Sequence, residues 1–358
     1  MNFERPNIKT MKGYKPGEQT EGSGIIKLNT NENPYPASPA VAATLKNLDA
    51  ENLRRYPPPL ADSFREAAAK LHNVNENNII PTNGGDELLR LAITTFVDPN
   101  EKILVTQPSY SLYPVLTSIQ GGILIQIPLQ QDWSMPSDFE VSLTSSGAKM
   151  CILVNPHAPT GKLLDTDYLA RLADSFQGIL LIDEAYVDFV DPDFQYNSVS
   201  LIESNENILI LRSLSKGYSL AGLRFGYGIG PQHLLEPMLY KTRDSYNTNT
   251  VAQHLATAAI ESADYAHSTW DRVRKSRSVL TDGLNQMGLN TVPSQANFVL
   301  CQVPNSISAK GLYEGLKRQN ILVRYFDQDR LKDRLRISVG SDTENTALLE
   351  AIHSLIKT

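Results

Sequence analysis

Short apolar runs alternate with helical patterns along the middle of the chain. Six such runs predict strands: Ile103–Val105, Ile123–Ile127, Cys151–Val154, Ile179–Ile182, Ile208–Leu211 and Phe225–Ile229. Their nearly continuous apolar character is typical of strands in a mainly parallel sheet that helices cover on both faces. The segments 84–96 and 166–176, which precede or separate these runs, carry apolar residues at helical spacing. This alternation of strands and helices predicts an α/β fold.

The two ends of the chain have a different pattern. Residues 1–35 lack sustained periodicity, and turn-forming residues fill the segment 29–39, so we expect an irregular arm. Helical spacing follows at 38–48 and 60–72. Beyond residue 248 the pattern predicts a smaller α+β part, with a long, interrupted helical region at 249–287, strands at Asn297–Leu300, Ile321–Arg324 and Leu335–Val339, and helices at Ser308–Gln319 and Thr343–Ile356. We therefore expect an arm (1–35), a large domain (36–247) and a small domain (248–358).

Composition narrows the class of protein. A chain of 358 residues with 41% hydrophobic and 20% charged residues has ample material for globular cores. Its net charge of −6 disfavours general nucleic-acid binding, which needs a basic surface. We find no apolar run near the ~18 residues that span a bilayer, no secretory signal, and only two cysteines, far apart. These features predict a cytoplasmic protein that acts on small molecules, without nucleic-acid or membrane partners.

Polar side chains follow three of the predicted strands directly. Asn155 follows the run that ends at Val154, and Asp183 and Tyr186 follow the next run. Ser213, Ser215 and Lys216 follow the run that ends at Leu211, with Arg224 eight residues after the lysine. In open α/β sheets, ligands bind outside the carboxyl ends of the strands. We therefore expect these side chains to line a site.

One cofactor, pyridoxal 5′-phosphate, uses all of these groups. The amine of Lys216 would form a Schiff base with its aldehyde, and Ser213, Ser215 and Arg224 would bind its phosphate. The sequence Gly84-Gly85-Asp86 begins a predicted helix, whose free backbone N–H groups also suit a phosphate.

The remaining candidates suit the ring of this cofactor. Asp183 would pair with the protonated ring nitrogen and keep the ring an electron sink. Asn155 and Tyr186 would hydrogen-bond the ring hydroxyl. Tyr110 would stack on the ring face. The six histidines show no metal-ligand spacing, so we expect no metal.

Several motifs resemble a known family. The stretches NPHAPTG (155–161), DEAY (183–186), SLSKGYSLAGLR (213–224) and LRISVG (335–340) closely resemble the fold-type-I aminotransferases of class I and II. Tyr14, NENPYP (31–36), RYPPP (55–59), NGGDELLR (83–90) and ILVRYFD (321–327) are similar, within that group, to the histidinol-phosphate aminotransferases. The resemblance covers nearly the whole chain, in order.

The resemblance implies an activity and further site residues. The reaction would be a ping-pong transfer of an amino group between histidinol phosphate and 2-oxoglutarate, with Lys216 as the proton shuttle. Arg336 would bind the substrate anion, and the remaining substrate-binding candidates are Arg324, Tyr14, Asn33 and Asn297. Tyr56 would reach the cofactor phosphate of the neighbouring subunit, which implies a homodimer with shared sites. The family commonly has Asn-Asn-Pro-Thr-Gly where this chain has His157-Ala158-Pro159-Thr160-Gly161; since Asn155 is retained, we expect its contact with the ring to survive.

Three other functions remain open from the sequence. A decarboxylase of phosphothreonine would share the cofactor motifs. An aminotransferase of aromatic amino acids would bind a ring similar in shape to imidazole, although the second arginine, Arg324, favours a phosphorylated substrate. A non-catalytic binding module is the third, and the intact set of Lys216, Asp183, Tyr186 and Arg224 disfavours it.

Overall fold

A seven-stranded sheet forms the centre of the computed structural model, which describes residues 3–14, 17–19, 22 and 24–357. The strand order is β2-β8-β7-β6-β5-β3-β4. Strands β3 to β7 pair in parallel, whereas β8 is antiparallel to both β7 and β2. The bounds are Ile79–Thr82 (β2), Lys102–Gln107 (β3), Ile123–Pro128 (β4), Ala148–Val154 (β5), Ile179–Asp183 (β6), Ile208–Ser213 (β7) and Gly226–Ile229 (β8). The predicted α/β fold with a mainly parallel sheet is confirmed, and β2 is a strand that the sequence analysis missed.

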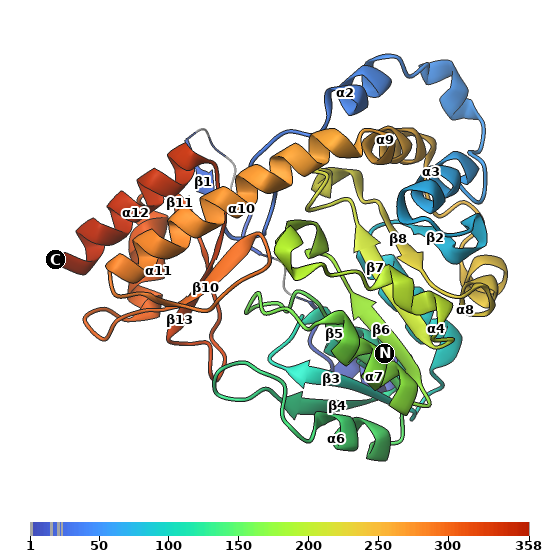
Figure 1. The fold of residues 1–358 in the computed structure, drawn as a ribbon, viewed down its shortest axis with the longest axis horizontal. Coiled ribbons are helices and arrows are strands. Elements are labelled where there is room, and N and C mark those ends of the chain that lie inside the picture. Colours follow the sequence, from blue (N-terminus) through green and yellow to red (C-terminus); the bar gives the residue numbers. More distant parts are fainter. Residues whose placement is uncertain (1–2, 15–16, 20–21, 23, 358) are drawn as a thin grey trace.

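Helices cover both faces of this sheet (Figure 1). Alternate residues of the central strands belong to two separate apolar clusters: Cys151 and Leu153 of β5 pack in one, and Met150 and Ile152 in the other. This explains why the central strands are apolar at most positions. The helices are Pro39–Lys46 (α2), Asp62–His72 (α3), Gly85–Phe96 (α4), Leu112–Gln120 (α5), Phe139–Ser145 (α6), Thr166–Ser175 (α7) and Gln232–Pro237 (α8).

Short helical turns fill several connections between these elements. They are 3₁₀ helices at Ala50–Arg54, Glu76–Asn78, Val187–Phe189, Pro192–Phe194, Val199–Glu203 and Ala221–Leu223, and a π-helix at Met238–Thr242. Among the described residues, we find no helix whose length and apolar character would let it cross a membrane.

The C-terminal part is built on a second, antiparallel sheet. Its strand order is β12-β13-β10-β9, with bounds Arg324–Tyr325, Arg334–Ser338, Phe298–Gln302 and Asn290–Thr291. Its helices are Thr250–Glu261 (α9), Ala263–Gln286 (α10), Ala309–Arg318 (α11) and Asp342–Lys357 (α12). The single strand expected at Ile321–Arg324 was wrong: Ile321–Leu322 (β11) pairs with Ile26–Lys27 (β1), whereas β12 pairs with β13. The chain changes sheets at the buried Val323.

Helix α10 connects the two parts of the molecule (Figure 1). Helix α9, which precedes it, packs on α2 and α3, whereas α10 packs on α12 and β10. The domain division at residue 247 stays a prediction.

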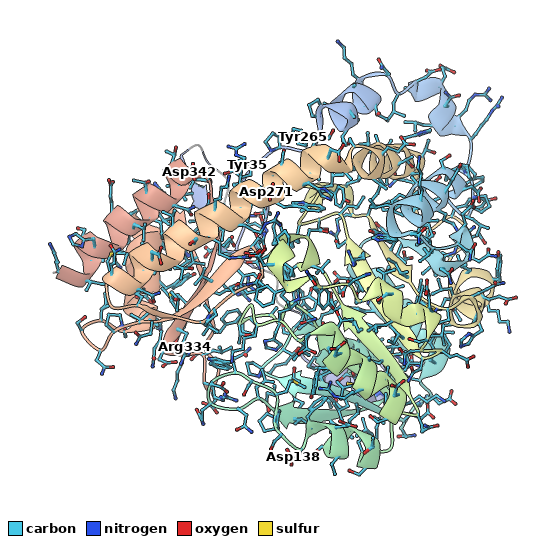
Figure 2. The ribbon with its side chains drawn as sticks, viewed as in Figure 1. Tyr35, Asp138, Tyr265, Asp271, Arg334 and Asp342 are labelled. Atoms are coloured by element: carbon cyan, nitrogen blue, oxygen red, sulfur yellow. The ribbon has the colours of Figure 1, made fainter. Side chains whose placement is uncertain are left out.

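The N-terminal arm runs along both parts. Its helix α1 (Pro6–Thr10) lies on α5, and its strand β1 joins β11. Tyr35 then lies beside α10 (Figure 2), with the guanidinium carbon of Arg272 3.6 Å from its ring centroid. The arm therefore passes between the large sheet and the C-terminal sheet.

Candidate active site

A cavity of about 540 Å³ opens where the carboxyl ends of β5, β6 and β7 face the arm and the C-terminal sheet. Twelve residues predicted for the site line this cavity: Tyr14, Gly85, Asp86, Tyr110, Asp183, Tyr186, Ser213, Ser215, Lys216, Arg224, Arg324 and Arg336. They come from segments as distant as residues 14 and 336. The fold therefore brings most of the predicted site together at the expected edge of the sheet.

Lys216 lies in the loop that follows β7. Its Nζ donates a hydrogen bond of 2.7 Å to the carbonyl oxygen of Thr30 in the arm. Burial and the positive charge of Arg336 lower the pKa of Lys216 to about 8. This lowered pKa increases the neutral fraction of the amine near neutral pH, and the neutral form is the nucleophile that attacks an aldehyde.

The N-terminus of α4 and Arg224 form one end of the cavity. Gly84 precedes α4 with a φ of +78°, and a Cβ there would lie 2.7 Å from Nη2 of Arg224. Nη1 of Arg224 lies 3.5 Å from the hydroxyl oxygen of Ser215, and its Nη2 lies 3.8 Å from the carboxylate of Asp86. The first backbone N–H groups of a helix have no partner within the helix, so this end suits an anion.

Asp183 ends β6 and is buried. The hydroxyl of Tyr113 donates to its Oδ2 at 2.8 Å, and the N–H of Ala185 donates to its Oδ1 at 3.1 Å. Burial raises the pKa of Asp183 to about 6, so a nearby positive charge would favour its ionised form. Tyr113, which was not predicted as a site residue, lies three residues after Tyr110 and could have been found from its closeness to that residue.

Aromatic rings form another wall of the cavity. Tyr110 packs edge-on against Tyr14 of the arm, with ring centroids 5.7 Å apart, and against Tyr113, at 5.5 Å. Its hydroxyl also donates to Asp86 at 3.4 Å. The arm thus places Tyr14 directly at the site.

Two arginines reach the cavity from the C-terminal sheet. Arg336 on β13 and Arg324 on β12 lie opposite one another in the antiparallel pair. Their guanidinium carbons lie 5.5 Å and 5.3 Å from the ring centroid of Phe326. Nη2 of Arg336 donates to the carbonyl oxygen of Asn29, whereas its Nε is buried without a partner among the described residues. The pair therefore presents two positive charges and an unpaired donor.

Asn155 does not lie on the cavity wall, in contrast to our expectation. Its Nδ2 donates to the carbonyl oxygen of Leu164 at 3.0 Å and to the hydroxyl of Tyr196 at 2.9 Å, and its Oδ1 accepts from the N–H of Leu164. These three hydrogen bonds hold the fully buried amide inside its own loop. The residue of this loop on the wall, next to Pro159, is Ala158.

His157 holds the same loop from the other side. Its two ring nitrogens lie 2.8 Å from the hydroxyl of Thr160 and 3.0 Å from the carbonyl oxygen of Pro108. Burial lowers the pKa of His157 to about 4, so the ring is neutral at neutral pH. The histidine therefore adds hydrogen bonds to the loop but no charge.

Besides Gly84, which directly precedes the lining residue Gly85, three more predicted residues lie outside the cavity lining. Asn33 donates to the carbonyl oxygen of Gly217 at 3.3 Å, directly after Lys216. Asn297 is fully buried and donates to the carbonyl oxygen of Asn31 at 2.9 Å. Tyr56 is 80% exposed and stacks on Tyr246, with ring centroids 4.4 Å apart. Conversely, Thr30 and Asn31 line the cavity although the sequence analysis gave them no role.

The donor set fits pyridoxal 5′-phosphate. A helix N-terminus, an arginine and two serines lie at one end, a buried carboxylate lies at another, and an amine with a lowered pKa lies between the arm and β7. In addition, the hydroxyl of Ser109 lines the cavity, and its oxygen is buried without a partner in the described part of the chain. A ligand with several acceptor oxygens would satisfy these groups.

Comparisons with known proteins agree with this geometry. Residues 23–352 match the model of the family described as aminotransferase class I and II. Proteins named histidinol-phosphate aminotransferase 1 from Trichormus variabilis and Nostoc sp. are 42% and 41% identical over 357 residues, which are 99% of this chain and of each relative. The crystal structure of histidinol-phosphate aminotransferase from Sinorhizobium meliloti in complex with pyridoxal-5′-phosphate has the same fold, with a TM-score of 0.91 at 22% identity over 100% of this chain and 98% of that chain. The chain therefore belongs to the class I and II aminotransferases and, within them, to the histidinol-phosphate aminotransferases.

Proposed function

We propose that the protein transfers an amino group between histidinol phosphate and 2-oxoglutarate, with pyridoxal 5′-phosphate as its cofactor. The observation that carries the substrate assignment is the pair of arginines, Arg336 and Arg324, in the same cavity as Lys216. A phosphate ester and a carboxylate are both anions that a guanidinium binds through paired hydrogen bonds. The names of the relatives that match over nearly the whole chain support the same substrate.

The residues of the large sheet would hold the cofactor. Arg224, Ser213, Ser215 and the backbone at Gly84–Asp86 would bind its phosphate, and Asp183 would face its ring nitrogen. Tyr186 would donate to its ring hydroxyl, and Tyr110 would lie on its ring face. When bound, the cofactor supplies an electron sink for the negative charge that develops on the substrate carbon.

Lys216 would move the proton in this reaction. Its Nζ, as the neutral amine, would take the proton from the substrate carbon and return it to the carbon that comes from the cofactor aldehyde. Asp183 in its ionised form would hold a positive charge on the ring nitrogen, and Tyr113 and the N–H of Ala185 would stabilise that form by hydrogen bonding. Burial from water strengthens each of these interactions.

The half-reaction tests the substrate assignment. We would load the protein with cofactor, add one amine at a time without a 2-oxo acid, and follow the visible absorbance. Loss of the absorbance with histidinol phosphate, at concentrations where phenylalanine and tyrosine have little effect, is the expected result. A response to aromatic amino acids alone would instead show an aromatic aminotransferase, and release of carbon dioxide from phosphothreonine would show a decarboxylase.

A matched pair of variants separates the two arginines. Arg324→Gln should raise the KM for histidinol phosphate more than the KM for glutamate, because Arg324 would serve the phosphate. Arg336→Gln should raise both, since the same guanidinium would bind either anion. Equal effects of Arg324→Gln on the two substrates would contradict a phosphate site at this position.

We also propose that the protein is a cytoplasmic homodimer with shared sites. The exposed ring of Tyr56 lies outside the cavity of its own chain, which supports a role in the site of a second copy.

A further inference from the structure

The arm segment Asn29-Thr30-Asn31 contacts both parts of the molecule at the cavity. The carbonyl oxygen of Asn29 accepts from Arg336 at 3.0 Å, and that of Thr30 accepts from Lys216 at 2.7 Å. Asn31 is buried, with an exposed fraction of 1%, although it carries a polar side chain. The function proposed above leaves Asn31 without a role, so its buried amide needs an explanation.

The hydrogen bonds of Asn31 fix the orientation of its amide. The hydroxyl oxygen of Ser338 accepts from the backbone N–H of Asn31 at 2.9 Å, and the hydroxyl donates its single proton to Oδ1 at 3.0 Å. Oδ1 therefore faces Ser338 on β13, and Nδ2 faces the opposite way. There, Nδ2 donates to the hydroxyl oxygen of Tyr186 at 3.1 Å.

This arrangement determines what the Tyr186 hydroxyl presents to the cavity. Its oxygen already accepts from Asn31, so its own proton is left for a partner inside the cavity that Tyr186 lines. Burial raises the pKa of Tyr186, so the proton is retained at neutral pH. A hydroxyl held in this way is a donor aimed at an acceptor oxygen of a bound molecule.

We propose that Asn31 is a positioning residue. Ser338 fixes the orientation of the Asn31 amide, and the amide, by donating to the hydroxyl oxygen of Tyr186, makes Tyr186 a donor toward the cofactor. Ser338 lies on the C-terminal sheet, and Tyr186 lines the cavity at the edge of the large sheet. Asn31 of the arm therefore links the cofactor site to the part of the molecule that carries Arg336. This inference rests on the proposed place of Tyr186 beside the cofactor ring and is independent of which amine is the substrate.

Two substitutions of Asn31 distinguish the effect of its hydrogen-bonding groups from the effect of its size. Asn31 has a φ of +56°, a left-handed conformation that glycine adopts freely and that asparagine and aspartate adopt more readily than most residues. Asn31→Gly keeps this backbone and removes the amide. Asn31→Asp keeps the shape but replaces the donor with a carboxylate, which only accepts hydrogen bonds. The carboxylate would accept a hydrogen bond from the Tyr186 hydroxyl, so the hydroxyl proton would point away from the cavity.

The experiment measures the Kd of pyridoxal 5′-phosphate by titrating the cofactor-free protein. We expect Asn31→Gly to raise the Kd about threefold, because the Tyr186 hydroxyl loses its fixed orientation. We expect the near-isosteric Asn31→Asp to raise it about tenfold or more, because the same hydroxyl then points its proton away from the cofactor. A role in packing alone predicts the opposite order, since aspartate fills the space of asparagine and glycine leaves it empty.

Controls connect the effect to Tyr186. In the Tyr186→Phe background the two substitutions at position 31 should leave the Kd unchanged, because the hydroxyl that they act on is gone. Asn73→Gly makes the same substitution at an exposed left-handed position at the end of α3, and should leave the Kd unchanged. Thermal unfolding of each cofactor-free variant would be measured in parallel.

Three results would overturn the inference. A larger effect of Asn31→Gly than of Asn31→Asp would show packing, and a difference between them that persists in the Tyr186→Phe background would show that the charge acts elsewhere. A Kd unchanged by Tyr186→Phe alone would remove the role of Tyr186 itself, and with it that of Asn31. If the variants at position 31 do not fold, Ser338→Ala serves instead: it should weaken binding in the native background and have no effect in the Tyr186→Phe background.

Discussion

Asn155 shows how a side chain of the expected type can serve the fold of a loop. Its three hydrogen bonds go to Leu164 and Tyr196, and none goes to the cavity. We predict that Asn155→Ala lowers the free energy of unfolding of the cofactor-free protein by about 3 kcal/mol, because it removes three hydrogen bonds, two of them to the backbone of Leu164 and one to the hydroxyl of Tyr196. Urea denaturation without cofactor measures this loss.

The comparison with Tyr186→Phe makes this prediction specific. Tyr186 lines the cavity, so its substitution should weaken cofactor binding and change the stability of the cofactor-free protein less than Asn155→Ala does. If Asn155→Ala instead left that stability unchanged and raised only the Kd of the cofactor, a direct contact with the ring would be the better explanation.

The lowered pKa of Lys216 leads to a prediction about pH. Only the neutral amine attacks the cofactor aldehyde, so the rate of cofactor attachment to the cofactor-free protein should rise with pH and level off above about 8. An ordinary lysine would level off near 10.4. Stopped-flow absorbance across a pH series measures this profile.

Arg336→Gln provides the matching variant. The positive charge of Arg336 disfavours protonation of Lys216, and Arg224 and Lys27 act in the same direction, whereas Glu32 opposes them. Removing the charge at position 336 should therefore raise the pKa of Lys216 and move the plateau to higher pH. A plateau that stays in place would show that the charge of Arg336 does not contribute to lowering this pKa.

At the scale of elements, the start of α4 ties backbone conformation to anion binding. Gly84→Ala places a Cβ at a φ of +78° and against the guanidinium of Arg224, whose flexible end would have to move. We expect a loss of stability of about 1 kcal/mol from backbone strain and a Kd for the cofactor raised about tenfold, which corresponds to one displaced hydrogen bond to phosphate. Gly288→Ala is the matched control, because Gly288 has a φ of +80° with nothing within 4 Å of the added Cβ. It should lose similar stability and bind the cofactor normally.

Elements whose signal is local were predictable from the sequence. The apolar runs of β3 to β8 and the helical spacing of α3, α4 and α7 depend on residues near in sequence, so they agree with the structure within a few residues. Strand β2 was missed because Pro81 and Thr82 end a short run, yet it pairs with β8 in the large sheet. Likewise, the break at Val323 results from pairing with β1, almost 300 residues earlier, which no local pattern contains.

The site residues divide in the same way into those with a local sequence signal and those that depend on distant partners. Lys216, Asp183 and Arg224 follow apolar runs and belong to recognisable motifs, so their places at one edge were predictable. Asn31, Thr30 and Tyr113 act through partners that are distant in sequence: Ser338, Lys216 and Asp183. Which asparagine of the stretch 31–36 faces the cavity depends on these contacts, and sequence alone selected Asn33.

At the scale of the whole molecule, the position of Tyr56 bears on subunit number. Its ring is 80% exposed and stacks on the half-exposed Tyr246, and Leu53, a few residues earlier in the chain, is also exposed. Single exposed apolar side chains are common, but grouped aromatic rings are typical of interfaces between subunits. If Tyr56 completes the site of a second copy, Lys216 and Tyr56 of one working site come from different chains.

Mixing two impaired variants tests this arrangement. Lys216→Ala should abolish turnover, and Tyr56→Ala should raise the Kd of the cofactor. In a hybrid dimer, the Tyr56→Ala chain contributes an intact Lys216 and the Lys216→Ala chain contributes an intact Tyr56, so one of the two sites is native. Co-expressed variants should therefore regain turnover at cofactor concentrations where each variant alone has almost none. If each site were built from a single chain, no site in these variants would contain both Lys216 and Tyr56, and turnover would not recover. The absence of any recovery, in a hybrid dimer confirmed by mass spectrometry, would therefore place Tyr56 outside the partner's site.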